Sequence, residues 1–241
     1  MEISNPTCMD VTRPTPARRA KAIPASVRRR RDAPSQSEQA YTQLKSALTT
    51  LAYKPGDYLN IAGLMQEQAL GRTPINHALH RLANEGLVQI IPRKGVMVSP
   101  LSIDDALELI QVRLANEVLC ARLAASKASE TDVARIRQTA REFDEAVAGR
   151  KSTEVMNLDR ILHEQIAEAA GNQMLAEILK VLHAKSQRFW AITLAAEGHL
   201  AEVRNEHAAI IDSLSRHDPD AAAAAVQEHV LSFQKALLRT R

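Results

Sequence analysis

Apolar residues recur at helical spacing along most of the chain, and short breaks divide them into separate segments. The apolar positions of residues 37–52 repeat every three or four residues, which predicts a first helix. Two shorter helices are predicted over 61–69 and 73–85. Asn60 is expected to cap the second helix, and Thr73-Pro74 to begin the third, with Thr73 as its N-cap.

A ribbon of two strands is predicted directly after the third helix. Gly86 is expected to end that helix, and the apolar runs 87–91 and 96–98 follow it. The basic segment Pro92-Arg93-Lys94-Gly95 lies between the two runs and would form the tip of the ribbon. This order of elements is typical of a helix-turn-helix followed by a β-ribbon wing.

Beyond a short linker at 99–102 the pattern is helical to the end of the chain. A long helix is expected to begin at Ser102 or Ile103 and to run through Leu123. Further helices are predicted over about 130–148, 152–170, 173–195, 199–216 and 219–239. We therefore predict a mainly α protein. Its winged helix-turn-helix domain would span residues 36–100, and an all-α helical bundle would span residues 101–241.

Charge is distributed unevenly along the 241 residues. Residues 1–35 carry eight Lys/Arg against three Asp/Glu, a net charge of +5, while residues 101–241 carry a net charge of −4. The first segment contains Arg28–Arg31 and several prolines without a hydrophobic period, so we expect a disordered basic tail. A basic first part joined to a mildly acidic body suggests a nucleic-acid-binding head, although the tail by itself is equally explained as a solubilising segment.

Composition excludes several classes of protein. The aromatic content of 3% disfavours a strand-rich sandwich. No apolar run approaches the roughly 20 residues that cross a bilayer, and no secretory signal is recognisable. The two cysteines, Cys8 and Cys120, give no disulfide framework. We therefore expect a cytoplasmic protein with no membrane partner.

The third predicted helix presents a polar face that suits DNA recognition. Its inward positions would be Ile75, Ala78, Leu79 and Leu82. Arg72 and Thr73 lie where a helix N-terminus meets phosphate, while Asn76 and His77 could contact base edges. Further DNA contacts are expected from Arg81, which would point to the DNA backbone or to a Glu, and from Arg93, Lys94 and Gly95 at the wing tip. The alternative is an ordinary helical hairpin with a solvated polar face, which the ribbon that follows disfavours.

A possible metal site is spread over three of the later helices. Asp159 and His163 are four residues apart, which places both side chains on one helix face. His207 and His229 lie on two other predicted helices, so a bundle could direct one carboxylate and three imidazoles into one cavity. This donor set suits Zn²⁺, Ni²⁺ or Mn²⁺, whereas the alternative for the pair is an ordinary polar helix face.

Residues 37–99 resemble the winged helix-turn-helix of the GntR-type bacterial regulators. The segments that carry the resemblance are Pro55-Gly56 with Leu59, Leu64, Arg72-Thr73-Pro74-Ile75, Ala78-Leu79, Arg81-Leu82, Glu85-Gly86-Leu87-Val88 and Gly95-Val96 with Val98. Two departures lie where such a domain faces DNA. Gly71 replaces the usual Ser, and Asn76-His77 replace the usual Arg-Glu. The usual operator of the family is therefore not transferred to this chain.

Residues 103–236 resemble the all-helical FCD effector domain of the FadR branch of that family. The matching segments are Arg113 with Glu117, Ala121 and Leu123-Ala124-Ala125, Asp159 with His163 and Ile166-Ala167, Ala170-Gly171-Asn172, Glu206-His207 with Ile210, Asp218 with Ala222 and Ala225, and His229. The resemblance implies that Asp159, His163, His207 and His229 bind a metal. It also implies that Arg113 completes the site of a small carboxylate effector.

The remaining histidines and aromatic residues match no position of that site. His183, His199 and His217 are expected at the surface. Trp190 with Phe189 could line the effector cavity, or could serve the core or a dimer contact.

Together these features predict a homodimeric, ligand-responsive transcriptional regulator. Two heads would bind a near-palindromic double-stranded operator, and a small organic acid would change the affinity, with repression as the expected mode. Two alternatives remain: a constitutive DNA-binding protein with a purely structural metal, and a metal-dependent enzyme. The head and the absence of a recognisable nucleophile or general base argue against an enzyme.

Overall fold

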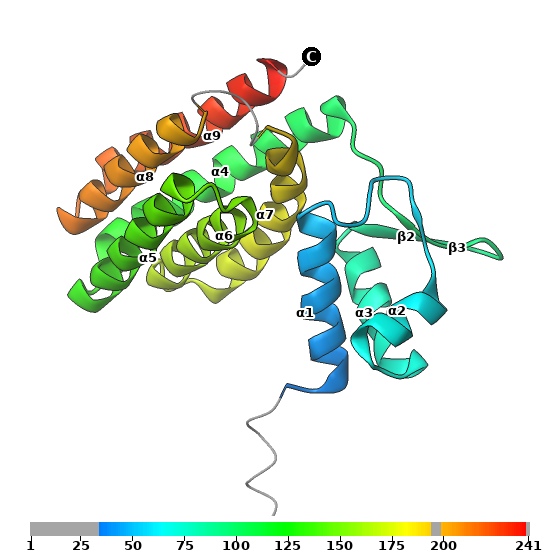
Figure 1. Ribbon diagram of the computed structural model, residues 1–241. Helices are drawn as coiled ribbons and strands as arrows, with labels where there is room; N and C mark the ends of the chain where they lie inside the picture. Colours follow the sequence, from blue (N-terminus) through cyan, green and yellow to red (C-terminus); the bar gives the residue numbers. More distant parts are fainter. Residues whose placement is uncertain (1–33, 194–198, 240–241) are drawn as a thin grey trace, which may run out of the picture. The chain divides into compact units, whose positions relative to one another are not determined.

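A computed structural model describes residues 34–193 and 199–239 of the chain, and their fold is mainly helical (Figure 1). The described residues begin with α1 (Gln36–Thr49), β1 (Tyr58–Leu59), α2 (Ile61–Gln68), α3 (Arg72–Asn84), β2 (Val88–Ile91) and β3 (Gly95–Val98). They continue with α4 (Ile103–Lys127), α5 (Glu130–Ala148), α6 (Ser152–Ala169), α7 (Gln173–Thr193), α8 (His199–Ser215) and α9 (Pro219–Arg239). The predicted mainly α fold with a small wing is confirmed. The predicted disordered tail lies outside the described residues except for Pro34 and Ser35.

Local sequence signals account for most helix ends. The side chain of Ser35 caps α1 by accepting a hydrogen bond from the backbone N–H of Glu38, and Asn60 caps α2 as predicted. Gly86 adopts a φ of +75° directly after α3, a conformation that favours glycine. The expected N-cap of α3 is wrong, however, because Gly71 holds that position without a side-chain bond and Thr73 lies inside the helix.

The three strands form an antiparallel sheet with β3 in the middle, in the order β1-β3-β2. β2 and β3 form the predicted ribbon, and Val88 pairs with Val98 across it. Tyr58 of β1 pairs with Met97, which ties the segment before α2 to the ribbon. The wing therefore has three strands, because the short strand Tyr58–Leu59 pairs with the edge of β3 that does not face β2.

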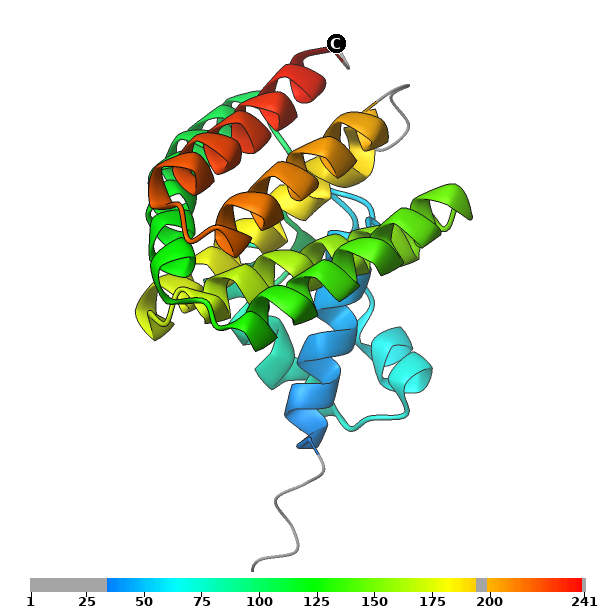
Figure 2. The same cartoon turned by 90° about the vertical axis from the view of Figure 1, so that its left-hand side faces the viewer.

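The buried residues form two hydrophobic clusters. One gathers α1, α2, α3 and the sheet, and the predicted inward residues Ile75, Ala78, Leu79 and Leu82 all lie in it. The other gathers α4 to α9, where α9 packs against α4 and α8, and α5 packs against α6 (Figure 2). Ala184 of α7 belongs to the first cluster, and residues 35–241 form a single compact unit. The proposed division at residue 100 therefore stays a prediction.

Candidate DNA-binding surface and metal centre

The outward face of α3 carries the side chains that the sequence predicted for DNA contact. Arg72, Thr73 and His77 are exposed and Asn76 is half-buried, all within the first two turns of the helix. The N-terminus of a helix offers unpaired backbone N–H groups, which favour phosphate. On the wing, Arg93 and Lys94 are exposed in the turn between β2 and β3, and Gly95 is exposed at the start of β3.

Arg81 has partners within the protein. Its guanidinium lies 2.6 Å from the carboxylate of Glu38 and 3.6 Å from the ring centre of Tyr41, both on α1. The hydroxyl of Tyr41 in turn donates a 2.5 Å hydrogen bond to Glu85 at the end of α3, and Lys45 lies 2.8 Å from the same carboxylate. Arg81 was expected to point either to the DNA backbone or to a Glu, and in the structure it pairs with Glu38. These contacts fix α1 against α3.

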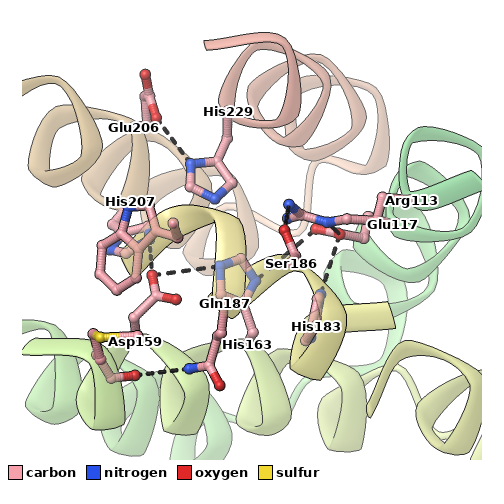
Figure 3. A network of polar contacts seen from close by, with 12 residues as sticks. Arg113, Glu117, Asp159, His163, His183, Ser186, Gln187, Glu206, His207 and His229 are labelled. Carbon is pink, nitrogen blue, oxygen red and sulfur yellow. Dashed lines mark hydrogen bonds and ion pairs between the residues drawn. The ribbon is translucent and has the colours of Figure 1, made fainter. Parts of the chain in front are cut away.

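The four predicted metal ligands converge inside the helical bundle of α4 to α9, where they form a polar cluster (Figure 3). Asp159 and His163 come from α6, His207 from α8 and His229 from α9. Asp159 Oδ1 lies 3.8 Å from Nε2 of His163 and 3.5 Å from Nε2 of His207. One nitrogen from each of the three histidines lies within 4.8 Å of the others. The histidines are all buried, so helix packing has brought together residues that are up to 70 positions apart in the sequence.

The electrostatics of this cluster favour the forms that bind metals. Burial lowers the pKa of His163 and of His207 well below the usual value, which leaves neutral imidazoles. Burial also raises the pKa of Asp159 to about 6. Metal ligation requires neutral imidazole and ionised carboxylate. At neutral pH the cluster therefore presents the neutral imidazoles of His163 and His207 together with the carboxylate of Asp159.

His207 provides the test of whether these residues fit a metal. Its ring is 2% exposed, yet neither Nδ1 nor Nε2 makes a hydrogen bond within the part of the chain that the structure describes. Buried polar atoms are nearly always paired, so two unpaired nitrogens on one ring call for a partner. A divalent ion between Asp159 and the histidines would satisfy Nε2, and the mixed nitrogen and oxygen donors suit zinc, nickel or manganese.

Glu206 contacts His229, one of the candidate ligands. His229 Nδ1 lies 2.8 Å from Oε2 of Glu206, so the second ring nitrogen, Nε2, is left for the cluster. Burial would raise the pKa of Glu206, but hydrogen bonds from His229 and Ser232 lower it overall. An ionised carboxylate on the outer nitrogen is the usual support for a metal-binding histidine. Glu206 is part of the resemblance to the FCD domain, but its contact with His229 was not predicted from the sequence.

Arg113 belongs to a buried charge network beside the candidate metal ligands. Its Nε lies 2.6 Å from Glu117, and one terminal nitrogen donates a 2.5 Å hydrogen bond to the hydroxyl of Ser186. His183 Nε2 lies 3.1 Å from the same carboxylate. Although burial alone would raise the pKa of Glu117, Arg113 and His183 hold it well below the usual value. Figure 3 shows this network next to His163, whose Nδ1 lies 4.0 Å from Glu117.

Two of the three histidines expected at the surface are buried instead. His183 is 8% exposed and His199 is 2% exposed, whereas His217 is exposed as predicted. Their burial results from helix packing: α7 lies against α4, which brings His183 to Glu117 across 66 positions of sequence. Spacing along one helix carries no signal for such a contact.

One cavity is lined both by candidate metal ligands and by Arg113. Its volume is about 480 Å³, including the space at its open mouth. Its lining includes Asp159, His163 and His229 together with polar and apolar side chains of α7, α8 and α9. Trp190 was expected either to line a cavity or to serve the core or a dimer contact, and it lines this cavity. Both Phe189 and Trp190 pack in the hydrophobic cluster of α4 to α9, and Phe189 lines a separate groove next to α4.

Comparison with known proteins identifies the family of the chain. Residues 36–98 match the family of bacterial regulatory proteins called gntR, and residues 108–232 match the FCD domain. The chain belongs to the GntR family. Its domain combination is that of the FadR-like branch, so this GntR-family protein is a transcriptional regulator and not an enzyme. Among its described residues, no helix is long and apolar enough to cross a membrane.

Several relatives extend over nearly the whole regulator. The HTH-type transcriptional regulator YdhC of Bacillus subtilis is 27% identical over 196 residues, which cover 80% of this chain and 85% of that protein. The HTH-type transcriptional repressor RspR of Escherichia coli is 23% identical, with 85% of this chain and 90% of that protein covered. The solved structure of E. coli McbR/YncC has the same fold, with a TM-score of 0.79 at 19% identity over 86% of this chain and 99% of that one.

Proposed function

We propose that this regulator is a homodimeric repressor whose operator affinity is set by a small organic acid bound next to a divalent metal ion. The observation that carries the metal is that both ring nitrogens of buried His207 lack a hydrogen bond among the described residues. Nε2 of this ring lies 3.5 Å from Asp159, and the ring centre lies 5.2 Å from that of His229. The expected ligands are Asp159, His163, His207 and His229, and zinc is the first candidate ion. When bound, the ion would supply a Lewis-acidic centre that attracts a carboxylate oxygen.

Arg113 is the proposed second anchor of the effector. A guanidinium has five N–H donors, and Glu117 and Ser186 occupy two of those on Arg113. The remaining donors belong to a side chain that lines the cavity, so a carboxylate entering it can accept from them. Glu117 and Ser186 thus hold the guanidinium in place before the effector arrives.

The proposed operator contacts come from α3 and the wing. Arg72 and Thr73 would bind phosphate at the start of α3, while Asn76 and His77 would meet base edges. Arg93, Lys94 and Gly95 would approach the backbone or the minor groove. Arg81 would act indirectly through Glu38 and Tyr41 by holding α3 against α1.

An apolar surface on α4 and α7 supports the proposed homodimer. Among the described residues, Val112 and Leu119 of α4 and Met174 and Ile178 of α7 are large apolar side chains that are at least 43% exposed. The exposed charges of α4 are acidic at its start (Asp104, Asp105 and Glu108) and basic at its end (Arg122 and Lys127). A two-fold axis across the middle of α4 would place acidic and basic ends together, which suits a second copy of the chain.

α7 is the proposed link between the cavity and the head. Its residues Ser186, Gln187 and Trp190 line the cavity. On the same helix, Ala184 packs into the hydrophobic cluster of α1, α2, α3 and the sheet. Arg188 donates a hydrogen bond to the backbone carbonyl of Ser99, the residue that follows β3. A shift of α7 on effector binding would therefore reach the wing. Couplings of this kind are typically worth about 1–3 kcal/mol.

Metal analysis and melting tests with small acids examine the ligand site. We expect about one metal per chain, and we expect His229→Ala to lose it while the exposed His80→Ala keeps it. Full metal occupancy in His229→Ala would refute the ligand set. If metal removal unfolds the protein and no acid changes operator affinity, the metal is structural and the protein is a constitutive DNA binder.

Operator binding tests the head separately. Arg72→Ala should weaken binding about tenfold or more and reduce its salt dependence, because a phosphate contact is lost. Arg141→Ala removes an exposed arginine of α5 and serves as the matched control. Equal operator affinity in both variants would refute the assignment of α3.

A further inference from the structure

His199 is a buried histidine that lines the cavity but belongs to no proposed metal site. It is the first residue of α8, it is 2% exposed, and it lies eight positions before His207 on the same helix. At a rise of about 1.5 Å per residue, this separates the two by roughly 12 Å along the helix axis. Between them Val203 lines the cavity, and Phe233 of α9 lines it as well. The cavity therefore brings His199 together with Asp159, His163 and His229, and both apolar side chains and the carboxylate of Glu206 line it.

One hydrogen bond fixes the proton of His199. The indole Nε1–H of Trp190 lies 3.3 Å from Nε2 of His199. An indole nitrogen can only donate, so Nε2 must accept, and a neutral ring then carries its proton on Nδ1. Burial lowers the pKa of His199, which favours the neutral ring.

The Nδ1–H of His199 has no acceptor among the described residues. The atom is buried and makes no hydrogen bond, and the carboxylate of Glu202 is 3.9 Å away, beyond hydrogen-bond distance. A buried donor without a partner is rare in a folded protein. Because His199 lines the cavity, a molecule in the cavity can supply the missing acceptor.

We propose that His199 Nδ1–H selects effectors that carry a neutral oxygen acceptor, such as a ketone, hydroxyl or amide oxygen, at the end away from their carboxylate. The inference rests on the proposed effector function and names its chemical class. A second carboxylate is disfavoured there because Glu202 and Glu206, on the same helix as His199, place negative charge nearby. The apolar side chains of Val203 and Phe233 suit an aliphatic middle.

Trp190 makes the test direct, because it is the only tryptophan of the chain. Its fluorescence can be titrated with acids matched in length: pentanoate, 4-oxopentanoate and succinate, and the next homologues hexanoate, 5-oxohexanoate and glutarate. In at least one length series the oxo acid should bind about tenfold or more tighter than both its alkyl and its dicarboxylate counterparts, because only it pairs the buried donor. Equal or tighter binding of the alkyl acids at both lengths would overturn the inference, since water would then satisfy Nδ1.

Two variants of His199 separate its two nitrogens. His199→Gln can accept from Trp190 at the position of Nε2 but has no donor at the position of Nδ1. His199→Asn can donate at the position of Nδ1 but leaves Trp190 without its acceptor. We expect the preference for oxo acids to disappear in His199→Gln and to persist in His199→Asn. An unchanged preference in His199→Gln would overturn the inference.

Metal content, measured for each variant, checks that the fold is retained. Acid binding to the unsubstituted protein distinguishes failure of the proposed effector function from failure of the proposed selection by His199. If no acid changes the fluorescence or the melting temperature, the proposed effector function fails, and the inference fails with it. If acids bind without regard to a neutral oxygen, the inference alone fails.

Discussion

The buried pair of Arg113 and Glu117 gives a prediction with a calculable size. Glu117→Gln keeps the shape of the side chain but leaves the guanidinium, in a residue that is 5% exposed, without its counter-charge. Removing one partner of a buried ion pair costs about 3–5 kcal/mol. For a protein of this size, 1 kcal/mol shifts the melting temperature by about 2–4 °C, so a fall of about 6–20 °C is expected.

The matched control is a surface pair of similar geometry. Arg204 and Asp144 lie 2.7 Å apart, but their side chains are 47% and 45% exposed. Exposed pairs contribute about 0–1 kcal/mol, so Asp144→Asn should lower the melting temperature by about 4 °C at most. Comparing both variants in excess Zn²⁺ and in chelator separates a lost ion pair from a lost metal.

A double variant tests the physical cause. Replacing both partners by apolar residues of similar volume, Arg113→Met with Glu117→Leu, removes the uncompensated charge and should be more stable than Glu117→Gln alone. If Glu117→Gln melts no lower than Asp144→Asn, the charge network around Arg113 is not buried as described, and the argument for a pre-positioned arginine fails.

Four further predictions concern the metal, the dimer and the tail. A chelator should lower the melting temperature by about 5–11 °C if the ion was present at about a hundredfold above its Kd, since that occupancy is worth about 2.7 kcal/mol; no change would argue against a bound ion. Glu206→Gln should weaken metal binding about 10- to 100-fold by calorimetry, and an unchanged affinity would remove its role in orienting His229. Leu119→Lys should convert a dimer to a monomer in light scattering, whereas a persistent dimer would place the interface elsewhere. Deletion of residues 1–34 should leave the melting temperature unchanged and at most reduce the salt dependence of operator binding; loss of folding would contradict it.

Local signals explain why the elements were predictable and where they misled. The spacing of apolar residues and breaks such as Gly86 and Asp218-Pro219 are read within a few neighbouring residues, and the predicted helices lie close to those found. The start of α3 was misplaced because the first four N–H groups of any helix lack partners. Pro74 is therefore tolerated at more than one position of the first turn, and the sequence alone did not distinguish Thr73 from Gly71 as the cap.

The amino-acid sequence predicted the order of the elements and the placing of Asp159 and His163 on one helix face. Through resemblance it also predicted the family and the proposed ligand set. Those features depend on spacing within a helix or on motifs. Helix packing, in contrast, is what pairs Arg81 with Glu38 and brings His183 to Glu117. It also buries the Nδ1–H of His199 without a hydrogen-bond acceptor among the described residues. These contacts depend on how separate helices pack, because packing sets which side chains meet and which lose water.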